Sequence, residues 1–159
     1  MRPYILSETN WNAVKDERFE LAILPWGATE AHNFHLPYSA DNIESDFIAA
    51  ESARLAWEKG AKVVVLPTIP YGVNTGQRNI YLDMNINPST QFAILSDIVD
   101  VLNHQKIFKL LILNSHGGND FKPFVRELGV KYPKMFISII NWYPVLTARW
   151  YAKTKMPQS

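Results

Sequence analysis

The sequence predicts an α/β fold, a three-layer α/β/α sandwich built around a mostly parallel sheet. Short apolar runs of strand length alternate with longer segments of helical composition along the chain. Because the runs are apolar at nearly every position, both faces of each strand are expected to be buried under helices. The length of 159 residues fits one domain, so we expect a single domain over residues 1–159.

The strands are predicted from apolar and β-branched runs. We expect them at residues 21–24, 62–66, 110–113 and 135–140. Pro25, Trp26 and Gly27 are expected to end the first of them, and Pro67 closes the second.

Three helices are predicted between and after these strands. Residues 43–58 contain helix formers without glycine or proline, and Gly60 follows as a stop signal. Pro88 suits the first turn of a second helix, with Asn87 as its cap. This helix carries an apolar stripe at three- and four-residue steps, formed by Phe92, Leu95, Val99 and Leu102. A third helix is expected at residues 121–131, with Pro123 in its first turn.

Composition and charge exclude several classes of function. Sixteen basic and fifteen acidic residues give a net charge of +1, which offers no support for a nucleic-acid or anionic-membrane partner. The absence of cysteine excludes disulfides, thiolate catalysis and cysteine-ligated zinc. No stretch approaches the roughly 20 apolar residues that cross a bilayer, and the N-terminus has no signal-peptide run. We expect a cytoplasmic protein.

Polar residues gather after the first and third expected strands, in the segments GATEAHNFHLPYSAD and NSHGGND. In open parallel sheets, ligands bind beyond the carboxyl ends of the strands. The two segments are therefore predicted to face one crevice. Glycines in the second segment would let backbone approach a ligand closely.

The residue types in this crevice predict a divalent-metal site with Glu30, His32, Asp41 and His116 as ligands. Imidazole and carboxylate groups together suit Zn²⁺, Mn²⁺ or Fe²⁺. Asp41 could bridge two ions, because a carboxylate has two oxygens with separate lone pairs. His104 lies near the end of a helix and is expected at the surface.

Two residues after His116 have alternative interpretations. Asp120 is expected to be a carboxylate at a helix N-terminus, although it could replace a metal ligand. Asn119 either caps that helix or contacts substrate.

These motifs resemble those of the creatininase (creatinine amidohydrolase) family. LPWGATEAHNFHLPYSAD is similar to the family pattern LPxGsxEqHGxHLPxxxD, and NSHGGN is similar to N-x-H-G-G-N. LPTIPYG, which contains Tyr71, resembles the strand-to-loop segment between them, and the similarity runs from about Trp11 to Trp142. The resemblance implies an α/β/α sandwich, often assembled as a hexamer. It also implies hydrolysis of cyclic amides, formamides or related C–N bonds of small molecules by a dinuclear metal centre.

Carried onto this chain, the resemblance implies roles for individual residues. Glu30 and His116 would bind one of two divalent ions (Zn, Mn or Fe), His32 would bind the other, and Asp41 would bridge them. Substrate contacts would come from the remaining loop residues His35, Tyr71, Gly117, Gly118 and Asn119. No catalytic acid is assigned.

The chain departs from the family pattern in three places. Gly118 stands where creatininase has a metal-binding Glu, and the family's His before a Phe-Pro-Gly-Thr turn is missing, with Gln77 or Arg78 near its position. Family chains also continue into a His-Ala-Gly-Glu-type motif, whereas the tail TARWYAKTKMPQS has neither His nor carboxylate and suggests a helix without its partner. We therefore expect the single domain to lack the family's C-terminal part.

Three functions are compatible with these features. The leading hypothesis is a metal-dependent hydrolase of a small amide, working as a homo-oligomer. The alternative is a metal- or ligand-binding domain without turnover, because it keeps the ligands and lacks the C-terminal motif. A structural subunit of an oligomer is the third, suggested by five Trp, seven Tyr and eight Phe. Trp142 and Tyr143 could either wall the crevice or pack under a further segment.

Overall fold

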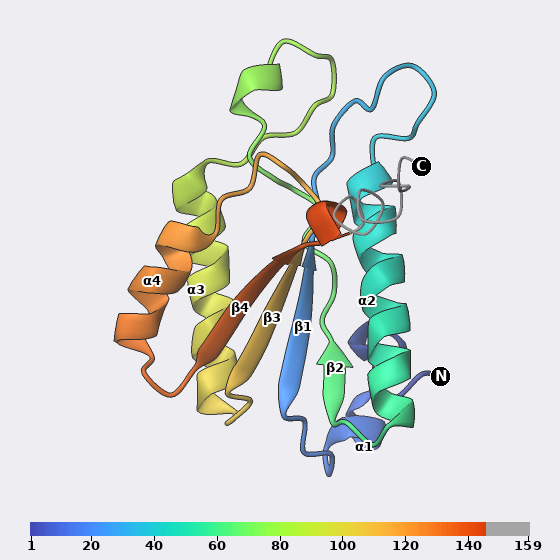
Figure 1. Cartoon of the computed structure of the whole chain (residues 1–159), viewed down its shortest axis with the longest axis vertical. Helices are drawn as coiled ribbons and strands as arrows, with labels where there is room; N and C mark the ends of the chain where they lie inside the picture. Colours follow the sequence, from blue (N-terminus) through green and yellow to red (C-terminus); the bar gives the residue numbers. More distant parts are fainter. Residues whose placement is uncertain (146–159) are drawn as a thin grey trace, which may run out of the picture.

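The computed structural model describes residues 1–145 and contains one four-stranded parallel sheet, with the strand order β2-β1-β3-β4 (Figure 1). The strands are β1 (Leu21–Trp26), β2 (Val63–Val65), β3 (Lys109–Asn114) and β4 (Phe136–Asn141). The helices are α1 (Trp11–Val14), α2 (Ala40–Glu58), α3 (Pro88–His104) and α4 (Lys122–Lys131), with 3-10 turns η1 (Leu6–Glu8) and η2 (Thr75–Gln77). The predicted α/β class is confirmed. The tail TARWYAKTKMPQS, and with it the expectation of an unpartnered helix, lies outside the described residues.

The parallel register places the carboxyl ends of all four strands at one edge of the sheet. Trp26 at the end of β1 lies opposite Asn114 at the end of β3, which in turn lies opposite Asn141 of β4. From β1 the chain passes through α2 to β2 on one side, and then through α3 to β3 on the other side of β1. This change of direction opens a crevice between the ends of β1 and β3, as is usual in such sheets.

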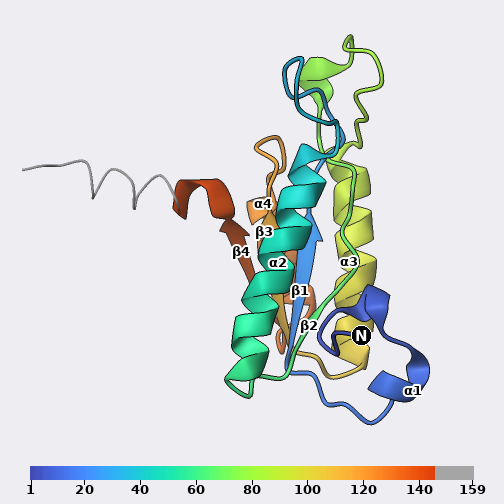
Figure 2. The same ribbon diagram turned by 90° about the vertical axis from the view of Figure 1, so that its right-hand side faces the viewer.

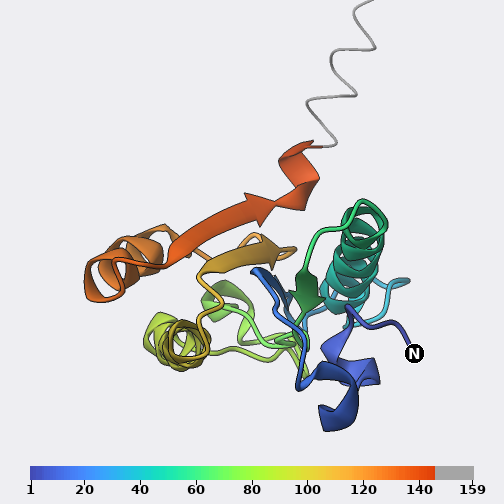
Figure 3. The ribbon, with the colours of Figure 1, turned by 90° about the horizontal axis from the view of Figure 1, so that it is seen from below.

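Helices cover the sheet on both faces, because the strands are apolar on both faces. In Figures 2 and 3, α2 lies against one face, whereas α3 and α4 lie against the other. Leu24 and Ile112 pack in the core under α3 and α4. Ile23 and Leu113 point the opposite way and pack with Ala49 of α2.

Helix α2 approaches the sheet through small side chains. Ala49 and Ala53 are fully buried on its inner face, and Ser45 lies one turn earlier on the same face. The helix begins at Ala40, three residues before the predicted start, so Asp41 lies in its first turn rather than in a loop. This places the Asp41 carboxylate on a rigid element at the crevice.

The predicted end of the first strand was wrong by two residues, since β1 continues through Pro25 to Trp26. Pro25 lacks an N–H donor, which would normally interrupt a sheet. Here the Pro25 carbonyl accepts from Ile69 N (3.0 Å), a residue beyond the end of β2. The nitrogen of Pro25 faces the same side, where β2 has already ended, so no hydrogen bond between the two strands is lost.

Predictions for the starts of α3 and α4 have different outcomes. Asn87 occupies the position before α3 as predicted, but its side chain makes no capping hydrogen bond. Asp120 behaves as predicted, because its Oδ1 accepts from Lys122 N (3.2 Å) at the start of α4.

Within the described part of the chain, no helix is long and apolar enough to cross a membrane.

Candidate metal centre

Four side chains from three segments converge in the crevice beyond the strand ends. His116 Nδ1 lies 3.2 Å from Glu30 Oε1 and 3.1 Å from Asp41 Oδ2. His32 Nε2 lies 3.0 Å from Asp41 Oδ1 and 3.6 Å from Glu30 Oε1. The prediction that the loops after β1 and β3 face one crevice is therefore confirmed.

The second nitrogen of each imidazole faces a backbone carbonyl. His116 Nε2 lies 3.1 Å from the Val73 carbonyl oxygen, and His32 Nδ1 lies 3.2 Å from that of Glu30. Because a carbonyl oxygen only accepts, each of these nitrogens carries the proton. In the neutral form of each ring, the lone pairs of His32 Nε2 and His116 Nδ1 are then directed at the carboxylates, which is the arrangement that protein carbonyls usually impose on metal-binding histidines.

Within residues 1–145, the two carboxylates are buried without a permanent positive charge beside them. Glu30 is 8% exposed and Asp41 is 5% exposed. Among the described residues, the ion-pair partners of both are the two imidazoles, and neither contacts lysine or arginine. Buried carboxylates are normally paired with a cation or bound to a metal.

The spacing of the ligand atoms suits a metal of the zinc or manganese type. Atoms bound tetrahedrally at about 2.1 Å from an ion lie about 3.4 Å from one another. Glu30, His32 and Asp41 each offer an atom within 4.8 Å of the others. Asp41 turns one oxygen to each imidazole, so His32 and His116 lie on opposite sides of its carboxylate. The donor set therefore fits a divalent metal.

Charges in the cluster shift the pKa of His116. Burial lowers it, but the hydrogen bond to Asp41, the hydrogen bond to Val73 and the charges of Glu30 and Asp41 together outweigh burial, so the pKa is raised above the ordinary value of 6.5. One turn along α2, partial burial and the Asp41 charge raise the pKa of the Glu44 carboxyl. The Asp41 carboxylate contributes to both shifts.

The raised pKa of His116 predicts the pH dependence of the metal-free protein. A pKa that is higher in the folded than in the unfolded state contributes stability in full below the unfolded-state value. That contribution is lost as the pH rises through the folded-state pKa. We expect the melting temperature of the metal-free protein to fall as the pH rises from about 6 to 8.5, and a His116→Gln variant to lose this slope. A melting temperature that rises with pH in wild type would contradict the assignment.

Close backbone packing fixes the position of the His116 ring. A Cβ added to Gly118 would lie 2.1 Å from the Val73 carbonyl oxygen and 2.5 Å from His116 Nε2. A Cβ at Gly72 would lie 2.8 Å from Cδ2 of the same ring. Both positions require glycine because of space, and neither has a positive φ.

Asn119 connects the loops that follow three strands. Its Nδ2 donates to Asn114 Oδ1 (3.0 Å) and to the Gly27 carbonyl (3.4 Å), while its Oδ1 accepts from Val73 N (3.1 Å) and from Gln91 Nε2 (2.8 Å). It does not cap α4, whose N-cap is Phe121 without a side-chain cap. The side-chain amide is therefore fully hydrogen-bonded inside the protein, and the proposed substrate contact of Asn119 stays an untested prediction.

Replacing Asn119 with Ala is expected to destabilise the protein by about 2 kcal/mol, because the buried Gln91 amide and the partly buried Val73 N–H would lose their acceptor. Chemical denaturation measures the effect. Asn79→Ala is the matched control, since Asn79 is exposed in the loop between η2 and α3. This substitution should change stability by less than about 0.5 kcal/mol. Equal stability of the two variants would contradict the structural role of Asn119.

The other predicted substrate contacts lie at the surface of the crevice loops. His35 and Gly117 are exposed, and Tyr71 is 48% exposed. No hydrogen bond or ion pair within the described part of the chain joins His35 to the metal-ligand cluster. Tyr71 contributes its carbonyl oxygen to Trp26 Nε1 (3.0 Å) and leaves its ring at the surface.

The sequence placed Gln77 or Arg78 near the position of the family's missing histidine, and in the structure the two side chains point to different places. Gln77 Nε2 donates to Glu30 Oε2 at 2.8 Å. Arg78 instead lines a polar depression with Asp83, Asn85 and Asn87. Ser115 was missed as a positioning residue: its hydroxyl donates to the Asp41 carbonyl (2.7 Å) and holds α2 against the end of β3.

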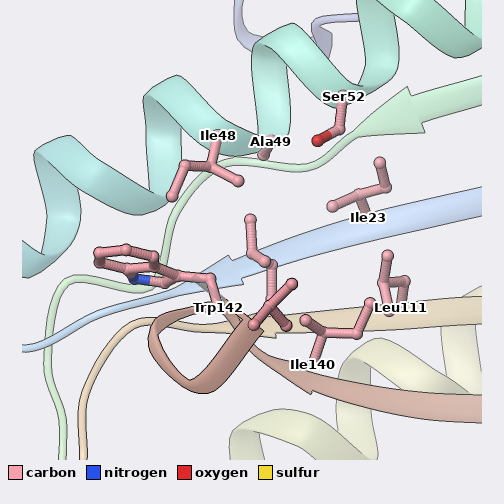
Figure 4. A pocket seen from close by; sticks show the side chains of 9 residues that line it. Ile23, Ile48, Ala49, Ser52, Leu111, Ile140 and Trp142 are labelled. Carbon is pink, nitrogen blue, oxygen red and sulfur yellow. The ribbon is translucent and has the colours of Figure 1, made fainter. Parts of the chain in front are cut away.

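Trp142 does not border the metal-ligand cluster. As Figure 4 shows, its indole lies at an apolar cavity that Ile48 of α2 and Ile140 of β4 line from opposite sides. The cavity has a volume of about 290 Å³. The structure therefore does not support the alternative in which Trp142 forms a wall of the crevice.

Comparisons with known proteins support the same relationship. The family profile described as "Creatininase: Creatinine amidohydrolase" matches residues 7–159. A crystal structure from Bacteroides fragilis, named "Putative creatinine amidohydrolase", is 42% identical to this chain with a TM-score of 0.87. The match covers 95% of this chain and 61% of the Bacteroides chain. No curated protein matches the sequence.

Two creatininase structures share the fold at lower identity. A mutant creatininase complexed with creatine is 20% identical (TM-score 0.71), and a mutant of Zn-Zn type is 20% identical (TM-score 0.67). Each match covers 97% of this chain and 66% of the creatininase chain. The chain thus spans about three fifths to two thirds of the length of these relatives. With the profile match over most of its length, the chain belongs to the creatininase family.

Proposed function

We propose that this protein binds two divalent metal ions through Glu30, His32, Asp41 and His116, and hydrolyses a non-peptide C–N bond of a small cyclic amide or formamide. The observation that carries the proposal is the orientation of the two imidazoles. Each turns one nitrogen to a backbone carbonyl and the other to buried carboxylates that have no lysine or arginine partner in the described residues. Such a cluster favours a bound cation over an empty site.

The protein groups divide the work of the site between them. Glu30 and His116 are placed to hold one ion and His32 the other, with one oxygen of Asp41 directed to each histidine. When bound, the ions supply a hydroxide near neutral pH from a shared water and polarise the amide carbonyl. The exposed Gly117 has open space where a side chain would be, which leaves room for a substrate at the rim.

The ions are proposed to be Zn, Mn or Fe, and the Zn-Zn type of creatininase supports the first of these. Homo-oligomeric assembly, as a hexamer by family resemblance, and a cytoplasmic location stay predictions.

The test is turnover by the purified chain. We expect hydrolysis of a formamide or lactam in the presence of Zn²⁺ or Mn²⁺, its loss with a chelator, and its return when metal is restored. A His104→Gln variant serves as the control, because it removes an exposed imidazole at the end of α3 and keeps the four ligands. Tight metal binding without turnover of any small amide would contradict the catalytic part of the proposal.

The second candidate function is a metal- or ligand-binding domain without turnover. Gly118 favours it, because any side chain there would meet the Val73 carbonyl oxygen at 2.1 Å. The position therefore cannot regain a carboxylate ligand unless the loop moves. The turnover assay distinguishes the two functions.

A further inference from the structure

We propose that Gln77 is a positioning residue that occupies one oxygen of Glu30, so that Glu30 reaches the metal centre through its other oxygen alone. This inference rests on the proposed function. It assigns a task to a side chain whose amide contacts a proposed metal ligand directly.

The two oxygens of Glu30 have different surroundings. Oε1 lies 3.2 Å from His116 Nδ1 and 3.6 Å from His32 Nε2, and so faces the ligand cluster. Oε2 accepts a hydrogen bond from Gln77 Nε2 at 2.8 Å. Since an ionised carboxylate only accepts hydrogen bonds, the amide group of Gln77 that faces it is the NH₂ donor.

The backbone around Gln77 is held by its own hydrogen bonds. Gln77 N donates to the Asn74 carbonyl (3.0 Å), and Ile80 N donates to the Gln77 carbonyl (2.9 Å). Asn74 is buried and donates through its side chain to the Met84 carbonyl (3.1 Å). The side chain of Gln77 therefore projects from a braced turn toward Glu30.

The loop that carries Gln77 is also joined to the Glu30 loop independently of the Gln77 amide. Asp83 Oδ1 accepts from Ala31 N (2.7 Å), and Met84 N donates to the Thr29 carbonyl (3.0 Å). Tyr38 Oη donates to the Tyr81 carbonyl (2.7 Å). Removal of the Gln77 amide should therefore free Glu30 Oε2 without releasing the loop.

The chemical consequence concerns the number of protein atoms around the ion. A carboxylate can bind a metal through one oxygen or through two. With Oε2 engaged, Glu30 supplies one, which leaves a further position for water or substrate. An amide donor also keeps this restraint at every pH near neutrality. A histidine in its place would change its charge in that range.

The test compares Gln77→Met with Gln105→Met, the same substitution at an exposed residue after α3. Methionine keeps the length of the side chain and removes the donor. Each protein is saturated with Co²⁺, whose visible absorption weakens as its coordination number rises, and Zn²⁺ affinity is measured by competition with a chromophoric chelator. Thermal unfolding of the metal-free proteins monitors the fold.

We expect Gln77→Met to give a weaker and shifted Co²⁺ spectrum. Its Zn²⁺ affinity should be lower on the order of 10-fold, as is typical when a residue that hydrogen-bonds a metal ligand is lost. The metal-free melting temperature should change by no more than about 2 °C, and Gln105→Met should match wild type. A Gln77→Met spectrum superimposable on that of metal-loaded wild type overturns the role of Gln77 and leaves the proposed function standing. Wild-type protein that binds no metal overturns the proposed function itself, and the role of Gln77 with it.

Discussion

Replacing Asp41 with Asn is expected to lower the metal affinity at least about 100-fold. Asp41 is 5% exposed, and its two oxygens lie 3.0 Å from His32 Nε2 and 3.1 Å from His116 Nδ1. The amide keeps the shape of the side chain but removes the negative charge and turns one ligand oxygen into a donor. Loss of an outer partner of a metal ligand alone costs roughly 10–100-fold in affinity, so loss of a central ligand should cost more.

Calorimetric titration of Zn²⁺ or Mn²⁺ into the metal-free protein measures this effect. Asp97→Asn is the matched control, because Asp97 is exposed on α3 at the opposite face of the sheet. The control should bind metal as wild type does. If Asp41→Asn kept wild-type affinity and stoichiometry, Asp41 would not be a ligand.

Replacing Gly118 with Ala is expected to lower the free energy of unfolding by about 3 kcal/mol, at the upper end of what overpacking costs. The new Cβ would lie 2.1 Å from the Val73 carbonyl oxygen, which is backbone and cannot move aside alone. For a chain of this length, the loss corresponds to a melting temperature lower by about 6–12 °C. Metal affinity should fall too, because the hydrogen bond from His116 Nε2 to that carbonyl would be displaced.

The neighbouring glycine provides the control for this prediction. A Cβ at Gly117 would meet nothing within 4 Å, and neither glycine has a positive φ. Gly117→Ala should therefore change the unfolding free energy by less than about 0.5 kcal/mol. Two variants with equal melting temperatures would show that the loop after β3 does not approach Val73 as closely as described.

The sheet and the order of its elements could be predicted from sequence because apolar runs and helix signals act locally. Leu110–Leu113 and the stripe containing Leu95 and Val99 are enough to locate a strand and a helix. Element ends were less predictable. Pro25 reads as the end of β1, yet the strand continues because the donor that proline lacks faces the side where β2 has already ended.

Part of the candidate site was also predictable, since the carboxyl ends of parallel strands must meet at one edge. That rule brings the loops containing Glu30 and His116 together. It cannot indicate which side chain from a third loop reaches them. The sequence offered Gln77 or Arg78 only as residues near the family's missing histidine, whereas in the structure Gln77 donates to Glu30 and Arg78 lines a separate depression. Likewise, the full use of the Asn119 amide depends on partners far away in sequence, such as Gln91 and Val73.

The number of divalent ions bound by the purified chain is the most direct test of a metal centre at Glu30, His32, Asp41 and His116. Metal-free protein is titrated with Zn²⁺ or Mn²⁺ beside a His32→Ala/His116→Ala variant, and bound metal is counted by elemental analysis. We expect two ions per wild-type chain and none held tightly by the double variant. Wild-type protein without bound metal, or a double variant that binds as wild type does, would contradict the account.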